Sequence, residues 1–329
     1  MMQDLYKVET LTKEKSLLFK GVYSDFCANA YSEYKFELEP LPFDEFIEAV
    51  DEGLIECIVL YENDFPTAFL VYTTATSEAI ELNMIHCLGD EELIEKQTKL
   101  IEEFLIRTKD LRKKSTVCYP MMGRQSDFTA DIAHYGFKYV GLAVLRFLMN
   151  DEQSNLIYEK TELTHLGYQM RIAPWNNSYK KEAIKVIHEN FKETTDALFD
   201  PRFKTLEGTE DIINKIVDNI YGEFLPEATS VLLHLEKPVG FAFANVTGGK
   251  ISNIPLVAIN KEFRGKGYSE HLLKRAIGVI KNWNNAGMRN FSEINVTTET
   301  DNYGALKMYR NVGFKEDYSY TQAFLPPTK

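Results

Sequence analysis

The second half of this chain takes its fold from one stretch, Ile254-Pro255-Leu256-Val257-Ala258-Ile259-Asn260-Lys261-Glu262-Phe263-Arg264-Gly265-Lys266-Gly267-Tyr268-Ser269. An apolar strand passes through a loop with two glycines into an amphipathic helix, which we expect from about Tyr268 to Trp283. Such a loop directs several backbone N–H groups toward one point, and the start of the helix adds partial positive charge. Gly265 and Gly267 let the backbone approach a ligand closely, because neither carries a Cβ atom. The segment therefore predicts a cradle for a pyrophosphate.

Three basic residues, Lys261, Arg264 and Lys266, add positive charge around this loop. Two other phosphate-binding motifs are excluded. A Walker loop needs Gly-Lys followed by Ser or Thr, and a dinucleotide fingerprint needs a third glycine after a parallel strand. On these residues alone, a glycine turn that merely enters a helix remains the alternative.

A second motif lies downstream and removes that ambiguity. The loop is similar to the CoA-binding motif of the GNAT acyltransferase superfamily, Arg/Gln-x-x-Gly-x-Gly/Ala, at Arg264, Gly267 and Ser269, although Ser269 replaces the last Gly or Ala. At the expected distance the chain continues with a further set that resembles the same family, namely Asn302, Ala305, Leu306, Tyr309, Gly313 and Phe314. The two motifs span about sixty residues, and their order makes the resemblance specific.

The resemblance implies a particular sheet and a particular ligand. In this family the fourth strand bulges away from the fifth, and the pantetheine arm of acetyl-CoA fills the gap. Pro255 fits this picture, since a proline inside a central strand requires a bulge or an unpaired edge. The implied acetyl-CoA contacts are Val257, Ile259, Arg264, Gly265, Lys266, Gly267, Tyr268, Ser269, Asn302 and Tyr309.

The same order of elements occurs twice along the chain. The tripeptide Gly-Phe-Lys recurs at Gly136 and at Gly313. Each half also has a hairpin pattern, at residues 56–72 around Asn63-Asp64 and at residues 230–244 around Lys237-Pro238, followed by a strand and an amphipathic helix. We therefore predict an α/β (α+β) fold of two GNAT-like domains in tandem. Each is a mixed, mostly antiparallel twisted sheet flanked by helices, with a splayed central strand pair. The predicted boundaries are 1–150, a linker at 151–165, and 166–329.

The first half shares the order of elements with the second half but lacks its cofactor-binding residues. At its cofactor position the chain carries one glycine, Gly89, followed by the carboxylates of Asp90, Glu91 and Glu92. Negative charge at the start of a helix repels a pyrophosphate. Aligned on Gly136, the position of Asn302 holds Gln125 and that of Tyr309 holds Ile132. We interpret residues 1–150 as a degenerate GNAT-like domain that does not bind CoA.

Acyl transfer to an amine requires a proton donor for the departing thiolate and a neutral amine. The resemblance implies that Tyr309 is the general acid, and it lies seven residues after Asn302 on one predicted helix. The base is open. Some relatives have a glutamate where this chain has Asn253, and an amide cannot take up a proton at neutral pH. Candidate bases are Glu293, Glu299, Asp301 and a chain of water molecules.

Composition and charge narrow the classes of partner and cofactor that remain. The net charge is −12, which disfavours nucleic acid as a partner, and the N-terminus and hydropathy predict neither a signal peptide nor a membrane span. We expect a cytoplasmic monomer or homodimer. The four cysteines form no Cys-x-x-Cys pair and the histidines lack metal-type spacing, so we expect no metal.

The leading hypothesis is an enzyme that transfers the acetyl group of acetyl-CoA directly to a primary amine of a small molecule. One alternative keeps the fold but changes the acyl donor or acceptor, as in tandem GNAT synthases. Another is a CoA-binding sensor or interaction protein with little turnover. An intact Tyr309 favours an enzyme, and the residues from about Asn176 to Glu210 are expected to set the acceptor.

Overall fold

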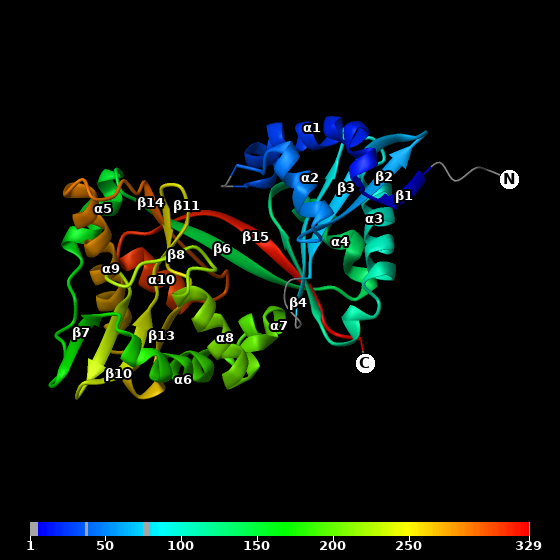
Figure 1. Cartoon of the computed structure of the whole chain (residues 1–329). Helices are drawn as coiled ribbons and strands as arrows, with labels where there is room; N and C mark the ends of the chain where they lie inside the picture. The colour runs from blue at the N-terminus through cyan, green and yellow to red at the C-terminus, as the bar shows by residue number, and fades with distance from the viewer. Residues whose placement is uncertain (1–5, 37–38, 75–78, 329) are drawn as a thin grey trace. The chain divides into compact units, whose positions relative to one another are not determined.

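The structure is a computed structural model that describes residues 6–36, 39–74 and 79–328. The chain divides into two compact units (Figure 1). Unit 1 comprises residues 1–140, 198–200 and 320–329, and unit 2 comprises residues 141–197 and 201–319. Both units combine a β-sheet with packed helices, so the predicted α/β class is confirmed.

Unit 1 is built on six neighbouring strands in the order β1-β2-β3-β4-β5-β15. The pairs are antiparallel except for β4 and β5, which run parallel. The strands are β1 (Tyr6–Thr10), β2 (Glu56–Glu62), β3 (Phe65–Thr73), β4 (Ala79–Cys87), β5 (Thr116–Met121) and the end of β15 (Lys315–Leu325). The helices are α1 (Ser16–Tyr34), α2 (Phe43–Asp51), α3 (Leu93–Arg107) and α4 (Thr129–Ile132), with short 3₁₀ helices η1 (Lys13–Lys15), η2 (Leu111–Lys113), η3 (Gly123–Phe128) and η4 (Ala133–Tyr135).

Helices cover both faces of the unit 1 sheet, which explains why its strands β2 and β3 are apolar at nearly every position. On β2, Ile58 and Leu60 pack in the same cluster as Leu100 of α3. Their neighbour Val59 faces the other way and packs in the cluster of Phe19 from α1. Because successive side chains of a strand point to opposite faces, a continuous apolar run is what a sheet buried on both sides requires.

Unit 2 has two sheets. One sheet has the order β13-β10-β9-β7 and is antiparallel throughout. The other has the order β6-β14-β12-β11-β8, in which β12 and β14 run parallel. The strands are β6 (Lys138–Leu148), β7 (Met170–Pro174), β8 (Glu223–Phe224), β9 (Ser230–His234), β10 (Lys237–Ala242), β11 (Asn245–Gly248), β12 (Ile251–Asn253), β13 (Val257–Ile259) and β14 (Glu293–Glu299). The helices are α5 (Glu152–Lys160), α6 (Lys180–Phe191), α7 (Asp196–Phe199), α8 (Leu206–Val217), α9 (Tyr268–Asn285) and α10 (Tyr303–Asn311), with 3₁₀ helices η5 (Asn177–Tyr179), η6 (Pro201–Lys204) and η7 (Lys261–Phe263).

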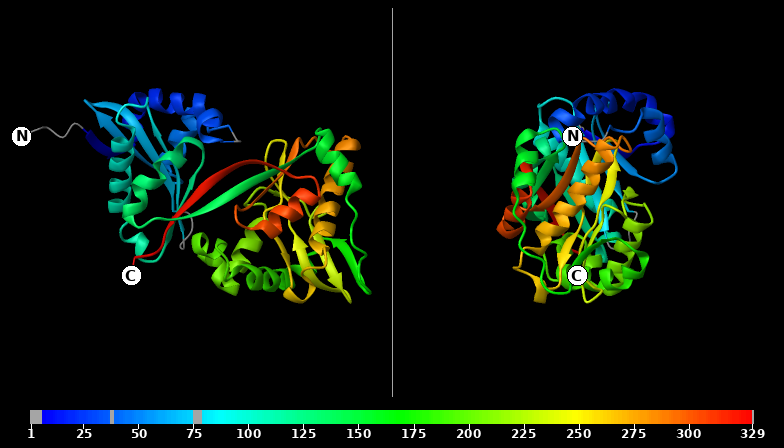
Figure 2. Two further views of the ribbon diagram at one scale, coloured as in Figure 1. Left: turned by 180° about the vertical axis from the view of Figure 1, so that it is seen from behind. Right: turned by 90° about the vertical axis from the view of Figure 1, so that its left-hand side faces the viewer.

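Two clusters sandwich the sheets of unit 2 (Figures 1 and 2). Helices α9 and α10, in orange and red, pack with Ile254, Ile294 and Val296 on one face. Helices α6 and α8, in green, pack with Leu256 and Ala258 on the opposite face.

Residues 254–256 divide one strand into two and send its halves to different sheets. β12 pairs with β14, and the N–H of Ile254 still donates to the carbonyl of Asn295 at 3.0 Å. Pro255 has no N–H, so the ladder ends there. The chain resumes as β13, which pairs with β10 instead. The predicted splay of the central strand pair is present.

Each unit contains a strand from the distant half of the sequence. Residues 142–148 of β6 pair with β14 inside unit 2, and residues 321–325 of β15 pair with β5 inside unit 1. Residues 151–165, where the sequence suggested a linker, contain helix α5. Asp151 caps that helix by accepting the N–H of Ser154 at 2.6 Å.

One turn differs from its prediction. The second hairpin turns at Leu235-Glu236, both with positive φ, and not at Lys237-Pro238. Two-residue hairpin turns with positive φ match the twist of their strands, and His234 pairs directly with Lys237. The first hairpin turns at Asn63-Asp64 as predicted, again with positive φ at both positions.

Candidate functional site

One edge of β13 lies open along the split in the sheet. The N–H of Phe243 donates to the carbonyl of Leu256 at 2.9 Å, and that of Asn260 donates to Val239 at 2.8 Å. Ladder bonds alternate along an antiparallel strand. The N–H groups of Val257 and Ile259 therefore point away from β10, on the side where the sheet ends. A ligand that lay beside this edge as an extra strand would meet these backbone donors.

The predicted glycine loop follows β13 after the short 3₁₀ helix η7. Gly265 and Gly267 have φ values of 73° and 77°, in the left-handed region that favours glycine. Gly267 is the N-cap of α9, so the first N–H groups of this helix have no intrahelical acceptor. A Cβ atom at Gly265 would meet no protein atom within 4 Å, whereas one at Gly267 would lie 2.8 Å from Oγ1 of Thr164. The space beside Gly265 is thus open to a ligand.

The two basic side chains of the loop are partly engaged by the protein itself. Arg264 donates through Nε to the carbonyl of Ile259 at 3.0 Å and through its terminal nitrogen to Asn190 of α6. Lys266 donates to the carbonyl of Glu262 at 3.1 Å. Arg264 therefore ties the loop to β13 and α6, in addition to adding positive charge beside the backbone donors.

Sequence reasoning missed two residues that fix the loop from outside. Oγ1 of Thr164 donates to the carbonyl of Lys266 at 2.8 Å, and Nε2 of the buried His271 lies 2.6 Å from the carbonyl of Thr164. No motif marks Thr164, because it precedes the loop by about a hundred residues and only the fold brings it there. His271 thus has a structural role in holding Thr164.

The second motif forms α10 and its two ends. Oδ1 of Asn302 accepts the N–H of Ala305 at 3.1 Å, which caps the helix. Gly313 follows the helix with a φ of 102°, and a Cβ atom there would lie 2.5 Å from the carbonyl oxygen of Ser154. Asn302 and Gly313 are therefore explained in part by the local structure, whereas Tyr309 is not.

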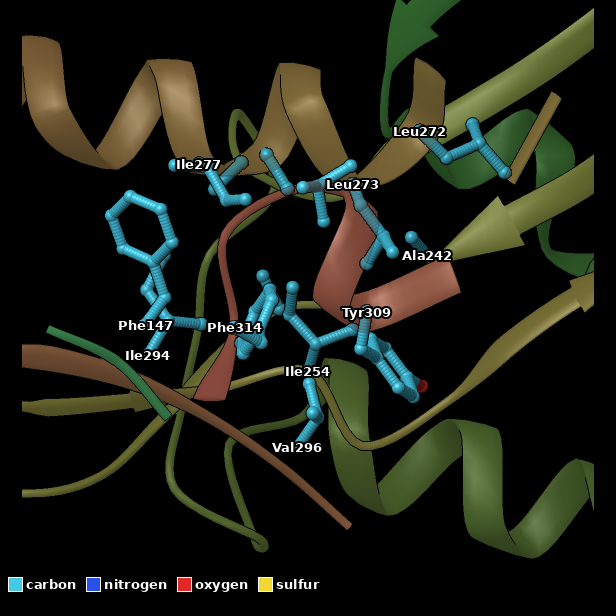
Figure 3. Close-up of a cluster of buried hydrophobic side chains, with 14 of the residues drawn as sticks. Phe147, Ala242, Ile254, Leu272, Leu273, Ile277, Ile294, Val296, Tyr309 and Phe314 are labelled. Atoms are coloured by element: carbon cyan, nitrogen blue, oxygen red, sulfur yellow. The ribbon is translucent and has the colours of Figure 1, made fainter. Parts of the chain in front are cut away.

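Tyr309 places a phenol at the edge of the core between α9, α10 and the sheet. Its side chain is only 6% exposed, and its ring packs at 5.6 Å from that of Phe314. Figure 3 shows the hydroxyl pointing away from the other labelled side chains of the cluster. Among the described residues, none forms a hydrogen bond with this hydroxyl. Burial, and then the negative charge of Asp196, raise the pKa of Tyr309 well above its usual value.

The candidate bases differ sharply in their surroundings. Glu293 is buried and forms an ion pair with Arg146 at 2.5 Å, so its carboxylate is committed to a structural contact. Asn253 lies in β12 in register with Asn295 and carries no ionisable group. Burial is the largest cause that raises the pKa of Glu299, and the charges of Asp196 and Asp301 act in the same direction. A carboxylate with a raised pKa is a better proton acceptor, which favours Glu299 over Glu293.

The corresponding gap in unit 1 is filled by the protein's own side chains. β4 pairs with β5 only at residues 79–81, after which the strands separate. Gln125 lies fully buried in the gap, where its Oε1 accepts the N–H of Ile85 at 3.0 Å and the hydroxyl of Tyr119 at 2.8 Å. The side chain of Gln125 thus uses a backbone donor corresponding to those that remain open in unit 2.

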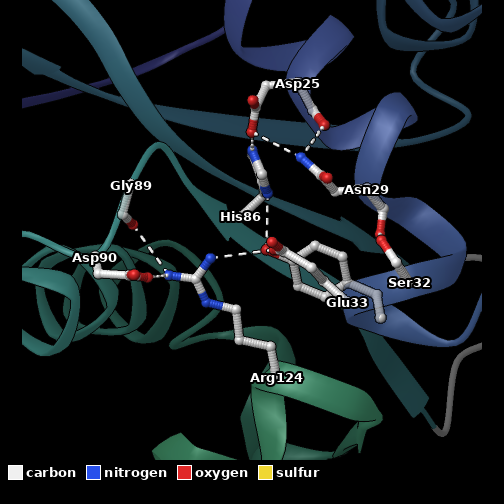
Figure 4. Close-up of polar contacts among 9 residues, drawn as sticks. Asp25, Asn29, Ser32, Glu33, His86, Gly89, Asp90 and Arg124 are labelled. Carbon is white, nitrogen blue, oxygen red and sulfur yellow. Dashed lines mark hydrogen bonds and ion pairs between the residues drawn. The ribbon is translucent and has the colours of Figure 1, made fainter.

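Arg124 closes the position that corresponds to the glycine loop (Figure 4). It forms an ion pair with Glu33 at 3.1 Å, donates to the carbonyl of Gly89 at 3.0 Å and pairs with Asp90. In the position of Tyr309, unit 1 has the fully buried Ile132, which offers no proton. Unit 1 therefore differs from unit 2 at each of the three features described above.

A buried histidine stands beside this closed gap. His86 lies between the hydroxyl of Tyr34, 2.7 Å from Nδ1, and a carboxylate oxygen of Asp25, 3.1 Å from Nε2 (Figure 4). Burial lowers the pKa of His86 to about 4, although Asp25 opposes the shift. The ring is therefore neutral at pH 7 and joins α1 to β4 as a structural contact.

The described residues contain no group of three or more His, Cys, Asp or Glu placed to hold a metal ion. Among the helices of the described part of the chain, none is long and apolar enough to cross a membrane.

Comparisons with known proteins agree with this geometry. The family model of the acetyltransferase (GNAT) family matches residues 193–314. N-alpha-acetyltransferase 30 of Schizosaccharomyces pombe is 26% identical over 147 residues, which are 44% of this chain and 82% of that protein.

Solved structures extend the likeness of fold to the whole chain. A GCN5-related N-acetyltransferase from Sphaerobacter thermophilus has a TM-score of 0.65 at 14% identity, covering 98% of this chain and 96% of its own. A tandem GNAT protein from the clavulanic acid biosynthesis pathway has a TM-score of 0.60 at 9% identity, covering 98% and 99%. Residues 193–314, which carry the two motifs at Arg264–Ser269 and Asn302–Phe314, thus match the acetyltransferase (GNAT) family, and the chain as a whole shares its fold with these solved structures.

Proposed function

We propose that unit 2 binds acetyl-CoA along the open edge of β13 and transfers its acetyl group directly to a primary amine of a small molecule. The observation that carries this proposal is the conjunction of three features in one unit. These are the backbone donors at Val257 and Ile259, the glycine loop at the start of α9, and a buried phenol at Tyr309 whose hydroxyl has no partner among the described residues.

The binding part of the proposal rests on how these donors are distributed. A pantetheine arm has amide groups that match the N–H groups of Val257 and Ile259, and a pyrophosphate matches the N–H groups at the start of α9. Gly265 leaves room for close approach, and Arg264 and Lys266 add positive charge. The remaining predicted contacts, Tyr268 and Ser269 in the first turn of α9 and Asn302 at the start of α10, stay part of the proposal.

The acceptor part of the proposal rests on the chemistry of the family. The relative from Schizosaccharomyces pombe is called an N-alpha-acetyltransferase, which supports transfer to an amino group. The segment expected to set the acceptor, Asn176 to Glu210, spans η5 to the start of α8 and packs on the face of the sheet opposite α9.

Two side chains would handle the protons of the reaction. Acetyl-CoA supplies the acetyl group, whose bond to sulfur breaks as the bond to the amine nitrogen forms. Tyr309 holds the proton that the sulfur takes up, and Glu299 is the proposed acceptor of the proton that the nitrogen loses. Both side chains return to their starting state by exchanging protons with water, so the cycle balances. The raised pKa of Tyr309 keeps that proton in place until the thiolate, which is itself destabilised where water is excluded, takes it up.

We propose that unit 1 supports the fold and does not bind CoA. The side chains of Gln125 and Arg124 occupy the positions that a pantetheine arm and a pyrophosphate would require. The carboxylates of Asp90, Glu91 and Glu92 add negative charge at the start of α3.

The loop is tested by a pair of matched glycine substitutions. Gly265→Ala should weaken acetyl-CoA binding about tenfold or more, because its Cβ would enter space that is empty of protein but needed by the ligand. Gly249→Ala is the control, since Gly249 also has positive φ and open space but lies in the turn between β11 and β12. Calorimetry on both variants provides the comparison. Equal affinities for the two variants would contradict the assignment of the loop.

The general acid is tested by removing one hydroxyl. Tyr309→Phe should retain acetyl-CoA affinity but lower kcat by about 10²- to 10⁴-fold, the usual contribution of a positioned acid. That corresponds to roughly 3 to 5 kcal/mol of activation free energy. Tyr303→Phe, on the exposed side of the same helix, should leave kcat unchanged. If Tyr309→Phe turns over like the wild type while chemistry limits the rate, the phenol only packs against Phe314.

The proposed base predicts a pH dependence. Glu299 accepts a proton only when ionised, so kcat/KM for the acceptor should fall as the pH is lowered through the pKa of this carboxyl. That pKa lies above the usual 4.5, owing to burial and to the charges of Asp196 and Asp301. Glu299→Gln should lower kcat/KM and remove this acidic limb. Pre-steady-state rates measured across pH check both points, and an unchanged limb in Glu299→Gln would show that another group titrates.

A further inference from the structure

Unit 1 contains a pocket that none of the residues proposed for catalysis or CoA binding lines. Its volume is about 1090 Å³, which is large enough for a small organic molecule. Its walls come mainly from α3, from the segment around η2 that follows it and from η4, and all of them belong to unit 1. We call it the α3 pocket, and the lining residues that give it its chemistry are Leu105, Ile106, Lys109, Arg112, Lys113 and Tyr135.

One part of the α3 pocket is apolar. Leu105 and Tyr135 are only partly buried where they pack against the core cluster of unit 1, and Ile106 is 68% exposed. A ligand with an apolar body would remove this surface from water. Single exposed apolar side chains are common on proteins, so this surface does not by itself indicate a site.

Arg112 distinguishes this pocket from an ordinary apolar depression. Its side chain is half-buried, and Nη2 donates to the carbonyl of Leu105 at 2.9 Å. Its Nε atom is buried, and no acceptor among the described residues bonds it. A guanidinium has five N–H donors, and a buried donor without an acceptor costs free energy. Arg112 therefore has donors left for an acceptor that comes from outside the described residues.

The charge of Arg112 is also unbalanced. In the part of the chain that the structure describes, Arg112 forms no ion pair with a carboxylate. Glu102, which also lines the pocket, accepts the hydroxyl of Tyr135 at 2.9 Å instead. Burial without a compensating negative charge lowers the pKa of the Arg112 guanidinium. An anion beside this side chain would supply the missing charge.

Two lysines make the α3 pocket basic within an acidic chain. Lys109 and Lys113 line it together with Arg112, whereas the chain as a whole has a net charge of −12. Lys113 pairs with Asp110 at 2.7 Å, but both side chains are mostly exposed, so solvent weakens that pair. The pocket therefore complements an anion, and a carboxylate matches the fork of N–H donors that a guanidinium offers.

We propose that the α3 pocket binds a small monocarboxylic acid with an apolar body, whose carboxylate pairs with Arg112 and whose body packs on Ile106 and Tyr135. An aliphatic acid of medium chain length meets both requirements, because its head needs one cation and its tail needs an apolar wall. The pocket is a second binding site of the chain, and it does not depend on the proposed acetyl-CoA site of unit 2.

The test compares ligands that share only one part of this chemistry. Octanoate carries the charged head and the apolar tail, octanamide has a tail of the same length with a neutral head, and acetate has the head without the tail. Calorimetric titration of the full chain should give octanoate an affinity about tenfold or more above that of either other ligand. This is the size of one charge-assisted hydrogen bond, or of a few buried methylene groups.

Substitutions locate the site. Arg112→Gln removes the charge but keeps a donor for the carbonyl of Leu105, and it should abolish the advantage of octanoate over octanamide. Ile106→Ser, at an exposed position, should weaken the binding of both ligands severalfold. Arg107→Gln is the matched control, because this arginine of α3 pairs with Glu103 and does not line the pocket. It should leave the affinity for octanoate unchanged.

An unchanged midpoint of thermal unfolding shows that a variant is folded. If Arg112→Gln is unfolded, Arg112→Lys takes its place, since lysine keeps the charge but loses the fork of donors, and it should reduce the advantage of octanoate severalfold. Equal affinities of the wild type for octanoate and octanamide would overturn the proposal, because the pocket would not recognise charge. An octanoate affinity that survives the substitution of Arg112 would place the ligand elsewhere and overturn it as well. If none of the three ligands binds, the α3 pocket does not serve this class of ligand.

Discussion

The missing N–H of Pro255 is the constraint on which the architecture of unit 2 depends. A strand that reached this residue from β12 cannot continue its ladder with β14, so the chain shifts to β10 and leaves a gap. The gap exposes the donors of β13, and the glycine loop and α9 follow at its end. One residue without a donor thus determines where a strand-like ligand could lie.

The two units share the order of their elements but differ in whether the gap between the separated central strands is filled by side chains of the protein. In unit 1 the strands also separate, but Gln125 satisfies the freed N–H of Ile85 and Arg124 binds the carbonyl of Gly89. A buried donor without a partner is costly, so a unit without a ligand must supply its own acceptor. Within the described residues of unit 2 no side chain bonds the N–H groups of Val257 and Ile259, and under the proposed function acetyl-CoA would supply the acceptors.

The fold was largely predictable from the sequence, because its signals are local. Pro255 indicated the split, the alternating strands indicated the hairpins, and the repeated Gly-Phe-Lys indicated two related halves. The exchange of β6 and β15 between the units was not predictable, since pairing partners so far apart leave no periodic trace. The same holds at the site. The glycines of the loop were visible in the sequence, whereas Thr164, which holds the loop, and Arg146, which pairs with Glu293, depend on contacts that only the tertiary structure creates.

The central claim is that the open gap of unit 2 is a binding site and the filled gap of unit 1 is not. The most direct measurement is a calorimetric titration of the full chain with acetyl-CoA. The account predicts one molecule bound per chain, because Gln125 takes up the N–H of Ile85 in unit 1, whereas within the described residues the N–H groups of Val257 and Ile259 in unit 2 have no partner. Two equivalent molecules per chain would show that Gln125 and Arg124 do not close unit 1. No binding would show that the split at Pro255 does not serve acetyl-CoA.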